Sequence, residues 1–167
     1  MRRFGTTMLG MIMAGWLTIA DFVPAIAGDN VPKTEQTEQQ QKVERYLEQS
    51  DNYYNDKMYE HAENETRKAL SLDPSSIKAY RYLGVYLTFQ GKYQEAVKDL
   101  AKGVELNQQL PVAQRSYGLH QSYGFALGKL GRWQEAAQQF KLVLEINPDF
   151  QKGQRSLNYA NKMLAKK

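Results

Sequence analysis

The sequence predicts an all-α fold, a superhelical stack of three helical hairpins with a C-terminal capping helix. Three observations lead to this prediction. Residues of the same kind recur 34 positions apart and then 40 positions apart, turn-forming residues separate the recurring segments, and the last segment carries a narrow apolar stripe. Because one hairpin cannot bury its own apolar face, successive hairpins must stack and the last one needs a cover.

The composition is typical of one globular domain. The chain has 167 residues, of which 42% are hydrophobic and 24% are charged, and this leaves enough apolar side chains for a core. The formal net charge of +4 is too small to indicate nucleic acid as a partner. Cysteine is absent, which excludes disulfides, thiolate zinc sites and cysteine nucleophiles.

Residues 1–27 are predicted to be a secretory signal peptide. Arg2 and Arg3 precede an uncharged, mostly apolar run over 8–20, and Ala25 and Ala27 suit a signal peptidase that cleaves after Ala27. Cleavage would leave an exported protein, periplasmic or secreted, without a membrane contact. The alternatives are a retained membrane anchor, which Asp21 disfavours, and a buried first helix of the fold.

Residues 28–41 are predicted to be a flexible polar linker before the helical domain at 42–167. No aliphatic residue follows Val31 in this segment, so it offers nothing to bury. Its Gln-rich end is either part of the linker or the start of the first helix.

Within the helical domain, three repeats are predicted at about 43–76, 77–110 and 117–150, followed by a capping helix at 150–167. The pairs 34 residues apart are Tyr46/Tyr80, Ser50/Gly84, Tyr59/Tyr93, Ala62/Ala96 and Ala69/Gly103. The pairs 40 residues apart are Tyr80/His120, Leu83/Tyr123, Gly84/Gly124, Leu87/Leu127, Gly91/Gly131, Tyr93/Trp133, Ala96/Ala136 and Leu100/Phe140.

Small residues predict close packing inside each hairpin. Gly84 and Gly124 on the first helices, with Ala96 and Ala136 on the second, let two antiparallel helices approach. In the first hairpin Ser50 and Ala62 hold these places. We therefore expect helices at about 43–55, 58–72, 77–90, 92–106, 113–130, 132–146 and 150–165.

Turn residues predict where the helices end. Gly91 and Gly131 allow the positive φ of a helix C-terminus, and the segment 55–57, Asn-Asp-Lys, stands at that place in the first hairpin. The segments 73–76 and 147–149 each contain a proline and are expected to break one helix and cap the next.

Six extra residues precede the third hairpin, and Ser116-Tyr117-Gly118 recurs as Ser122-Tyr123-Gly124. Two registers are therefore open, and the later one is preferred because Phe125, Leu127 and Gly131 then match the second repeat. The extra residues would either lengthen the first helix of that hairpin toward Pro111 or lie in the loop. They are either a tolerated insertion or a lip beside a groove.

These motifs resemble the tetratricopeptide repeat family over about 105 residues. The pattern Tyr80-x-x-Leu83-Gly84-x-x-Leu87, then Gly91-Lys92-Tyr93-x-x-Ala96, is the clearest copy, and Gly131-Arg132-Trp133-x-x-Ala136-x-x-x-Phe140 is nearly as good. The resemblance implies a non-enzymatic scaffold whose concave groove, lined by the first helix of each hairpin, binds another protein.

No catalytic residue, cofactor or metal site is expected. The two histidines, His61 and His120, lie on different predicted hairpins, and the sequence has no HExxH motif and no glycine-rich phosphate loop. His120 occupies the place of Tyr46 and Tyr80, which predicts a packing role, and His61 is expected at the surface.

The expected groove is aromatic and apolar with a basic margin, which suits a peptide or amphipathic helix with some acidic character. The alternatives are self-association and glycan binding. The charged clamp with which some family members hold chaperone C-termini is not matched, because Leu47, Asp51, Tyr82 and Gln121 stand near its places. The candidate groove residues are Leu47, Asp51, Tyr54, Lys78, Arg81, Tyr82, Val85, Phe89, Gln121, Ser122, Phe125 and Lys129.

Overall fold

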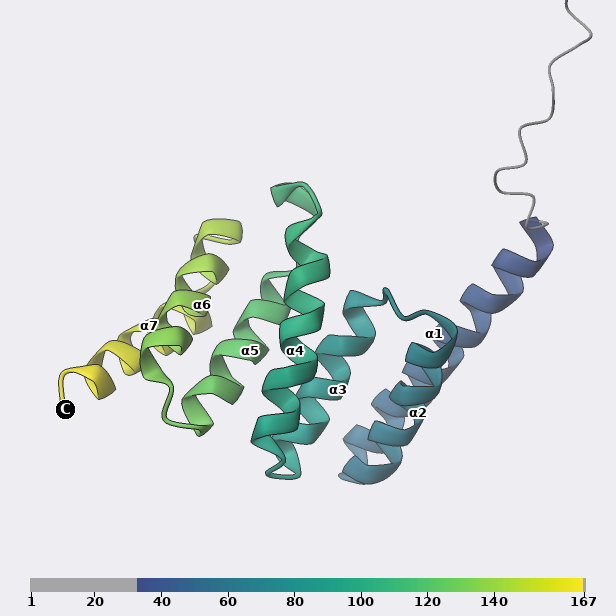
Figure 1. The fold of residues 1–167 in the computed structure, drawn as a ribbon, viewed down its shortest axis with the longest axis horizontal. Coiled ribbons are helices and arrows are strands. Elements are labelled where there is room, and N and C mark those ends of the chain that lie inside the picture. The colour runs from purple at the N-terminus through teal and green to yellow at the C-terminus, as the bar shows by residue number, and fades with distance from the viewer. Residues whose placement is uncertain (1–32, 167) are drawn as a thin grey trace, which may run out of the picture. The chain divides into compact units, whose positions relative to one another are not determined.

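The computed structural model describes residues 33–166, with the side chains described from residue 37 onward. The predicted signal peptide and residues 28–32 of the predicted linker lie outside this range. The described chain forms seven α-helices and one short 3₁₀ helix (Figure 1). They are α1 (Lys33–Asn55), α2 (Tyr59–Leu72), α3 (Ile77–Phe89), α4 (Tyr93–Gln108), η2 (Val112–Gln114), α5 (Tyr117–Lys129), α6 (Trp133–Ile146) and α7 (Gln151–Leu164).

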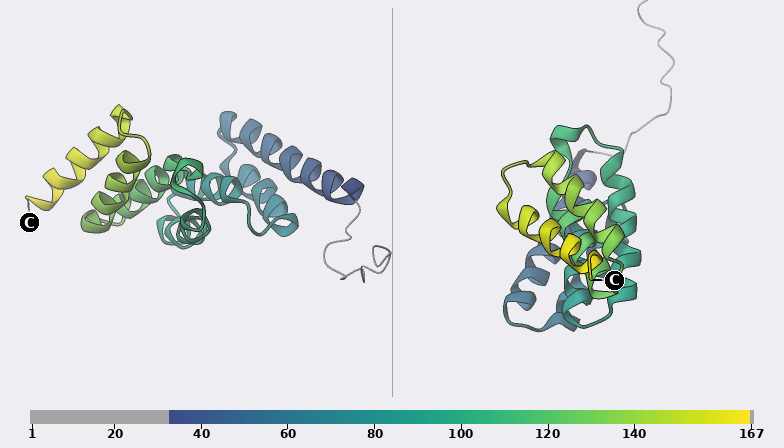
Figure 2. Two further views of the ribbon diagram at one scale, coloured as in Figure 1. Left: turned by 90° about the horizontal axis from the view of Figure 1, so that it is seen from above. Right: turned by 90° about the vertical axis from the view of Figure 1, so that its left-hand side faces the viewer.

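The helices pair as predicted. α1 packs on α2, α3 on α4 and α5 on α6, and α7 packs mainly on α6. α3 also contacts α5, and α5 contacts α7, so the first helices of the hairpins form one row and α7 extends it (Figures 1 and 2). The all-α stack of three hairpins with a capping helix is thus confirmed.

α1 begins ten residues earlier than the expected start at residue 43. Most of the predicted linker is therefore helical, and Gln39 shows how this part is held, because its side-chain amide donates to the carbonyl of Leu72 over 2.7 Å. Lacking apolar side chains, this segment carries no hydrophobic signal, but Glu, Gln and Lys are all good helix formers.

Two glycines set the distance between the helices of a hairpin. A Cβ built on Gly84 would lie within 2.6 Å of three carbons of the Leu100 side chain, and one built on Gly124 would lie 2.6 Å from Cε1 of Phe140. The same contact thus occurs in both hairpins at the same spacing. This confirms the later of the two registers for the third repeat.

In the first hairpin the polar pair Ser50 and Thr66 replaces this glycine–apolar contact. Both side chains are fully buried, and both donate to carbonyls of their own helix, Ser50 to Leu47 and Thr66 to Ala62. The hydroxyl groups are thereby satisfied inside the core.

The turns within the hairpins need a left-handed residue. Gly91 and Gly131 have φ values of 78° and 72°, and Lys57 takes the same place with φ 60°. Lys57 is the one residue other than glycine with positive φ in the described chain. The expectation that the Asn-Asp-Lys segment tolerates this turn is confirmed.

The six extra residues lie in the connection between α4 and α5. α5 has 13 residues, as α3 has, so the expected helix start at residue 113 is wrong. Ser116 is the reason, because it adopts an extended backbone and its side chain accepts the N–H of Leu119. The side chain of Asn107 accepts the N–H of Ser116 over 2.7 Å and so ties the two ends of the connection together.

Capping follows the prediction at one of the two predicted places. Ser76 accepts the N–H of Ala79 at the start of α3. The N-cap of α7 is Phe150, which makes no capping hydrogen bond, so the expected cap within 147–149 is not formed. Inside α7, Ala160 is buried and Leu157 and Leu164 pack on the core, which confirms the predicted inner stripe.

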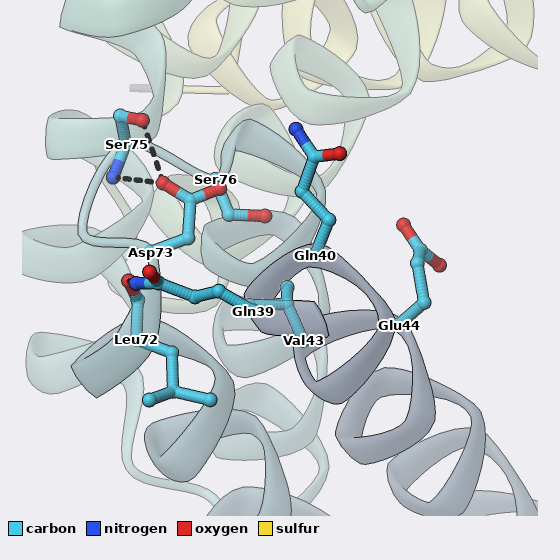
Figure 3. Close-up of a pocket in the computed structure, with 8 residues that line it drawn as sticks. All are labelled: Gln39, Gln40, Val43, Glu44, Leu72, Asp73, Ser75 and Ser76. Carbon is cyan, nitrogen blue, oxygen red and sulfur yellow. Dashed lines mark hydrogen bonds between the residues drawn. The ribbon is translucent and has the colours of Figure 1, made fainter. Parts of the chain in front are cut away.

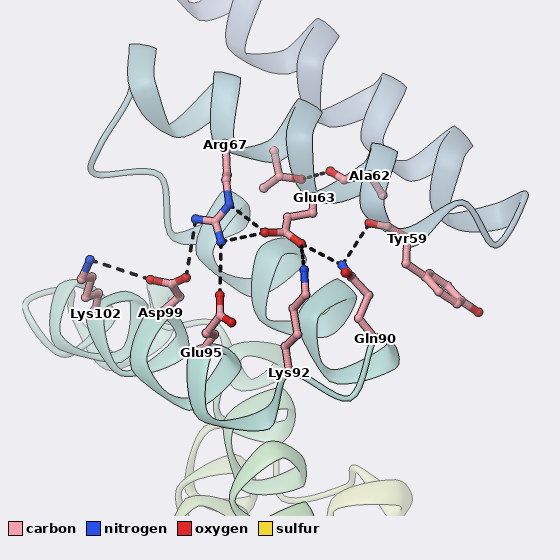
Figure 4. Close-up of polar contacts among 10 residues, drawn as sticks. Tyr59, Ala62, Glu63, Arg67, Gln90, Lys92, Glu95, Asp99 and Lys102 are labelled. Atoms are coloured by element: carbon pink, nitrogen blue, oxygen red, sulfur yellow. Dashed lines mark hydrogen bonds and ion pairs between the residues drawn. The ribbon is translucent and has the colours of Figure 1, made fainter.

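The second helices of the first two hairpins are tied by charge (Figure 4). The buried carboxylate of Glu63 on α2 accepts from Arg67 of the same helix, from Gln90 at the end of α3, and from Lys92 at 3.1 Å. Burial by itself raises the pKa of Glu63, but these hydrogen bonds outweigh burial and lower it. Arg67 also reaches Asp99 on α4 at 3.9 Å.

Candidate partner-binding groove

A cavity of about 320 Å³ opens where α1, α3, α5 and α7 meet, and we call it the central cavity. Each helix supplies part of its wall. Of the predicted groove residues it brings together six and adds three others. The lining residues are Tyr54, Val85, Thr88, Phe89, Gln121, Ser122, Phe125, Lys152 and Ser156.

An aromatic cluster forms the α1–α3 side of the central cavity. The ring of Phe89 stacks on Tyr59 with centroids 5.2 Å apart and meets Tyr54 edge-on at 5.4 Å. Tyr54 in turn lies 5.2 Å from Tyr86. The cluster fixes Phe89 from two sides, yet 54% of its surface stays exposed. Phe89 is therefore a rigid aromatic surface open to a ligand.

Tyr86 packs against Tyr54 on the buried side of this cluster. The sequence analysis did not predict this supporting role. Tyr86 is 2% exposed, and its hydroxyl lies 3.3 Å from the hydroxyl of Ser50. Burial raises its pKa to about 12. The repeat pattern does not predict a buried aromatic residue at position 86, because Asn52 and Ala126 stand at the matching places of the other repeats. The sequence did indicate burial in another way, because Tyr86 follows Leu83 by three residues and so shares its face of α3.

A larger cavity of about 710 Å³ adjoins the central cavity, and we call it the α7 cavity. It shares Phe125, Lys152 and Ser156 with the central cavity, so the two form one continuous groove. Phe125 is 49% exposed in this groove. The lining residues are Gly124, Phe125, Gly128, Lys129, Trp133, Phe140, Lys152, Arg155, Ser156 and Tyr159.

The contribution of α7 was also missed. The sequence predicts α7 only as a cover with an apolar stripe, whereas side chains of this helix line both cavities. The amide of Gln121 on α5 donates to the hydroxyl of Ser156 on α7 over 2.9 Å and joins the two walls. The sequence contains one indication of this role. Tyr159 follows Phe125 by 34 residues, which is one repeat length, so Tyr159 on α7 matches a groove residue of the preceding first helix.

Leu47 is a correction to the predicted groove. It is 1% exposed and packs in the core with Val43, Ala69 and Ala79. Its place in the repeat explains this burial. Arg81 is the equivalent residue of the second repeat, and Cδ of Arg81 faces Gly118 on α5, the first helix of the next hairpin. This position points at the following hairpin and not into the groove.

Four other predicted groove residues line neither cavity. Asp51 is exposed on α1. Lys78 forms an ion pair with Glu44 at 2.7 Å, and the guanidinium of Arg81 stacks on the ring of Tyr82 at 4.7 Å. The predicted basic margin at this end of α3 is therefore engaged within the protein itself.

A third hollow, of about 670 Å³, lies between α1 and the turn from α2 to α3 (Figure 3). Its wall is mostly polar, with Gln39, Gln40 and Glu44 on α1, and Asp73 and Ser75 on the turn. The carboxylate of Asp73 is already hydrogen-bonded within the turn, because it accepts both the N–H and the hydroxyl of Ser75. The hollow offers no exposed aromatic surface comparable with Phe89 or Phe125.

Over 33–166, no group of three or more His, Asp or Glu side chains is placed to hold a metal ion. None of the helices in that range combines the length and the apolar character needed to cross a bilayer.

Comparison with known proteins gives a family and a fold. The family model described as tetratricopeptide repeat matches residues 76–110. The structure resembles the tetratricopeptide domain of Arabidopsis OM64, with a TM-score of 0.67 and 19% identity over 74% of this chain and 98% of that one. No curated protein matches the sequence.

Two further solved structures are similar. One is the first tetratricopeptide domain of Spaghetti (RPAP3) bound to the HSP90 peptide SRMEEVD, with a TM-score of 0.69 and 22% identity over 75% of this chain and 94% of that one. The other is the crystal structure of MamA, with a TM-score of 0.65 and 22% identity over 78% of this chain and 72% of that one.

Proposed function

The chain is a tetratricopeptide repeat protein, and from that premise we propose that it is a non-enzymatic scaffold that binds a segment of another protein in its groove. One observation carries the proposal. Phe89 and Phe125, each about half exposed, face a continuous groove that four helices build. Exposed, rigidly held aromatic side chains in a concave site are typical anchors of protein interfaces.

The buried surroundings of these rings favour binding. Phe89 is held against Tyr54 and Tyr59, so little side-chain freedom is lost when a ligand covers it. Covering the exposed half of each phenylalanine would contribute about 1 kcal/mol per ring. The similar domain of Spaghetti (RPAP3) binds a peptide, which supports the same use of this fold here.

We also propose that the protein works outside the cytoplasm, in a periplasm or a comparable space, in the assembly of an envelope complex. The support is the amino-acid pattern of residues 1–27, with two arginines, an apolar run and small residues before Gly28. N-terminal sequencing of the protein recovered from the cell envelope tests this part. We expect it to begin at Gly28, and a start at Met1 would contradict cleavage.

Affinity capture tests the binding function. The full chain, tagged at its C-terminus, is recovered with its bound proteins from the exporting cell, beside the variant Phe89→Ala/Phe125→Ala. The matched control is Val112→Ala, which removes an exposed apolar side chain that lines neither cavity.

We expect a protein that is captured by the wild type and by the control and is lost from the double variant. Identical captures from all three would contradict the proposal. If only the bait itself is captured, and the double variant alone no longer self-associates in sedimentation, the groove serves self-association instead. Retention of a soluble glycan by the wild type, with no protein partner, would favour glycan binding.

A further inference from the structure

One side of α7 and of the turn after it carries a row of cations, which we call the basic stripe. Successive members are three, seven and four residues apart, so they share one side of the helix. Tyr159 lies among them and is 56% exposed. From its first to its last member the stripe extends about 20 Å along the helix axis. It consists of Lys152, Arg155, Lys162 and Lys166, all of which are exposed.

The basic stripe has no compensating negative charge. The segment 150–166 contains no aspartate or glutamate. Within residues 37–166 no ion pair involves a member of the stripe, whereas Lys68, Lys78 and Lys92 elsewhere are each paired with a glutamate. Unpaired cations along one line are complementary to a surface that carries many negative charges.

The stripe lies at the open end of the described stack. The place of Arg155 is held in the first repeat by Leu47, which is buried, and in the second by Arg81, whose Cδ faces Gly118 of the next hairpin. This place is therefore the one that a following hairpin covers. No described hairpin follows α7 (Figure 1), and Arg155 is exposed there.

The apolar side of α7 is already in use. Leu157, Ala160 and Leu164 pack on the core, so a partner of the stripe meets only charges and the exposed ring of Tyr159. Lysine and arginine side chains bind phosphate oxygens through charge-assisted hydrogen bonds. Tyrosine is enriched at the level of lipid headgroups, where its ring is partly in an apolar environment and its hydroxyl meets water.

Charge is unevenly distributed along the stack. The first hairpin, 33–75, has 10 acidic and 6 basic residues, which gives a net charge of −4. The segment 109–166 has 3 acidic and 8 basic residues, which gives +5. α1 and α7 lie at opposite ends of the described stack (Figure 1). A negatively charged surface therefore attracts the α7 end and repels the α1 end.

We propose that the basic stripe docks the protein on the surface of an anionic phospholipid bilayer, with α7 at the headgroups and the first hairpin directed away. Headgroup phosphates pair with the stripe, and the ring of Tyr159 lies among them. Lys162 and Lys166 line neither cavity, so this contact is additional to the groove. It is peripheral, and it departs from the expectation of an exported chain without a membrane contact, which considered residues 1–27 alone.

The test is co-sedimentation with lipid vesicles, using the protein recovered from the exporting cell. The vesicles contain phosphatidylcholine alone or with about one third phosphatidylglycerol, an anionic lipid. The wild type is compared with Lys162→Glu/Lys166→Glu and with the control Lys98→Glu/Lys141→Glu. The control makes the same change in net charge at exposed positions of α4 and α6, and melting curves verify that each variant folds.

We expect the wild type and the control to bind the anionic vesicles more strongly than the phosphatidylcholine vesicles, and to be released as salt rises from about 0.1 M to about 0.5 M. Lys162→Glu/Lys166→Glu should bind at least about tenfold more weakly, because each basic residue near an anionic surface contributes about fivefold. Equal binding by the two variants, whether strong or weak, would overturn the inference. So would capture of an acidic protein through these two lysines by a wild type that binds no anionic vesicle.

The direction of docking has its own readout. The chain contains no cysteine, so an environment-sensitive fluorophore can be attached at a single site, through Asn158→Cys beside the stripe or Asn52→Cys on α1. Both asparagines are exposed. Anionic vesicles should shift the emission to shorter wavelength at position 158 and leave it unchanged at position 52. Equal shifts at both positions, or no shift at position 158, would overturn the inference.

The groove and the stripe can fail separately. Lys162→Glu/Lys166→Glu should capture the same groove partner as the wild type, and Phe89→Ala/Phe125→Ala should bind anionic vesicles as the wild type does. Loss of vesicle binding in Phe89→Ala/Phe125→Ala would overturn the inference, because the groove would then make the membrane contact.

Discussion

Lys57 holds a backbone conformation that glycine holds in the other two hairpins. Its φ of 60° costs a side-chain-bearing residue about 1 kcal/mol relative to glycine. We therefore expect Lys57→Gly to raise the free energy of unfolding by about 0.5–1 kcal/mol in urea titrations. Gly91→Ala should lower it by a similar amount. If Lys57→Gly were destabilising, the strain ascribed to this turn would be wrong.

His120 is a buried histidine with a defined proton arrangement. The side-chain oxygen of Asn107 accepts the N–H of Ser116, so its nitrogen donates to Nε2 of His120 at 3.1 Å. Nδ1 of His120 then donates to Gln139 at 2.9 Å. The predicted packing role is confirmed, since the ring is 2% exposed, and the histidine also joins α4 to α6.

The pKa of His120 gives a prediction about pH. Burial, with a smaller effect from Arg115, lowers this pKa below its ordinary value of 6.5, although the hydrogen bond to Gln139 and the charge of Glu145 oppose the shift. The unfolded chain therefore takes up the proton first, so stability is full above about pH 6.5 and falls as the pH drops below it.

Melting temperatures at about pH 7.5 and about pH 5.5 test this prediction. The wild type should lose stability over this interval and His120→Gln should lose less. The control His61→Gln changes an exposed histidine and should behave as the wild type does. Equal pH dependence in all three proteins would refute the prediction.

At the scale of elements, the ion pairs of Glu63 join the first hairpin to the second. Glu63→Gln should lower the free energy of unfolding by about 1–2 kcal/mol near pH 7, because buried, charge-assisted hydrogen bonds are lost. The folded-state pKa of Glu63 lies below its ordinary value of 4.5. The wild type's advantage should therefore persist above that value and disappear as the pH falls through the lowered pKa.

Urea titrations at neutral and acid pH measure this difference. Glu135→Gln is the control, because Glu135 pairs at the surface with Arg132, the residue that caps α6, and this pair should matter little. A difference between wild type and Glu63→Gln that stays constant with pH would contradict the account.

The connection between α4 and α5 is expected to be dispensable for folding. Deleting residues 110–115 would leave Asn107, Gln108, Gln109 and Ser116, which matches the connection at 73–76 in length and in its capping serine. The melting temperature should change little, and the circular dichroism spectrum should stay helical. Loss of folding would show that the bonds from Arg115 to the carbonyls of Leu110 and Gln108 are essential.

Particular residues show what the sequence can predict here. Gly84, Gly124, Gly91 and Gly131 are read correctly because each serves a local geometric need, a close contact or a positive φ. The fold class follows from such repeated needs. The start of α1 was missed because its polar residues give no hydrophobic period.

The groove was predicted in part for a related reason. Seven predicted residues line it, because a repeat register predicts which face of a first helix is turned inward. They are Tyr54, Val85, Phe89, Gln121, Ser122, Phe125 and Lys129. Leu47 was placed wrongly because the same register does not show which positions the next hairpin covers. The part played by Lys152, Arg155 and Tyr159 depends on how α7 packs, which no internal repeat specifies.

For the molecule, the central claim is that the row of first helices and α7 forms a protein-binding groove. The most direct test introduces a photo-crosslinking amino acid in the living cell at position 89 or 125, and in parallel at positions 98 and 138. The latter two residues are exposed on α4 and α6 and line neither cavity. The account predicts light-dependent adducts with one partner protein from positions 89 and 125 alone. Adducts from 98 or 138 but not from 89 or 125 would contradict it.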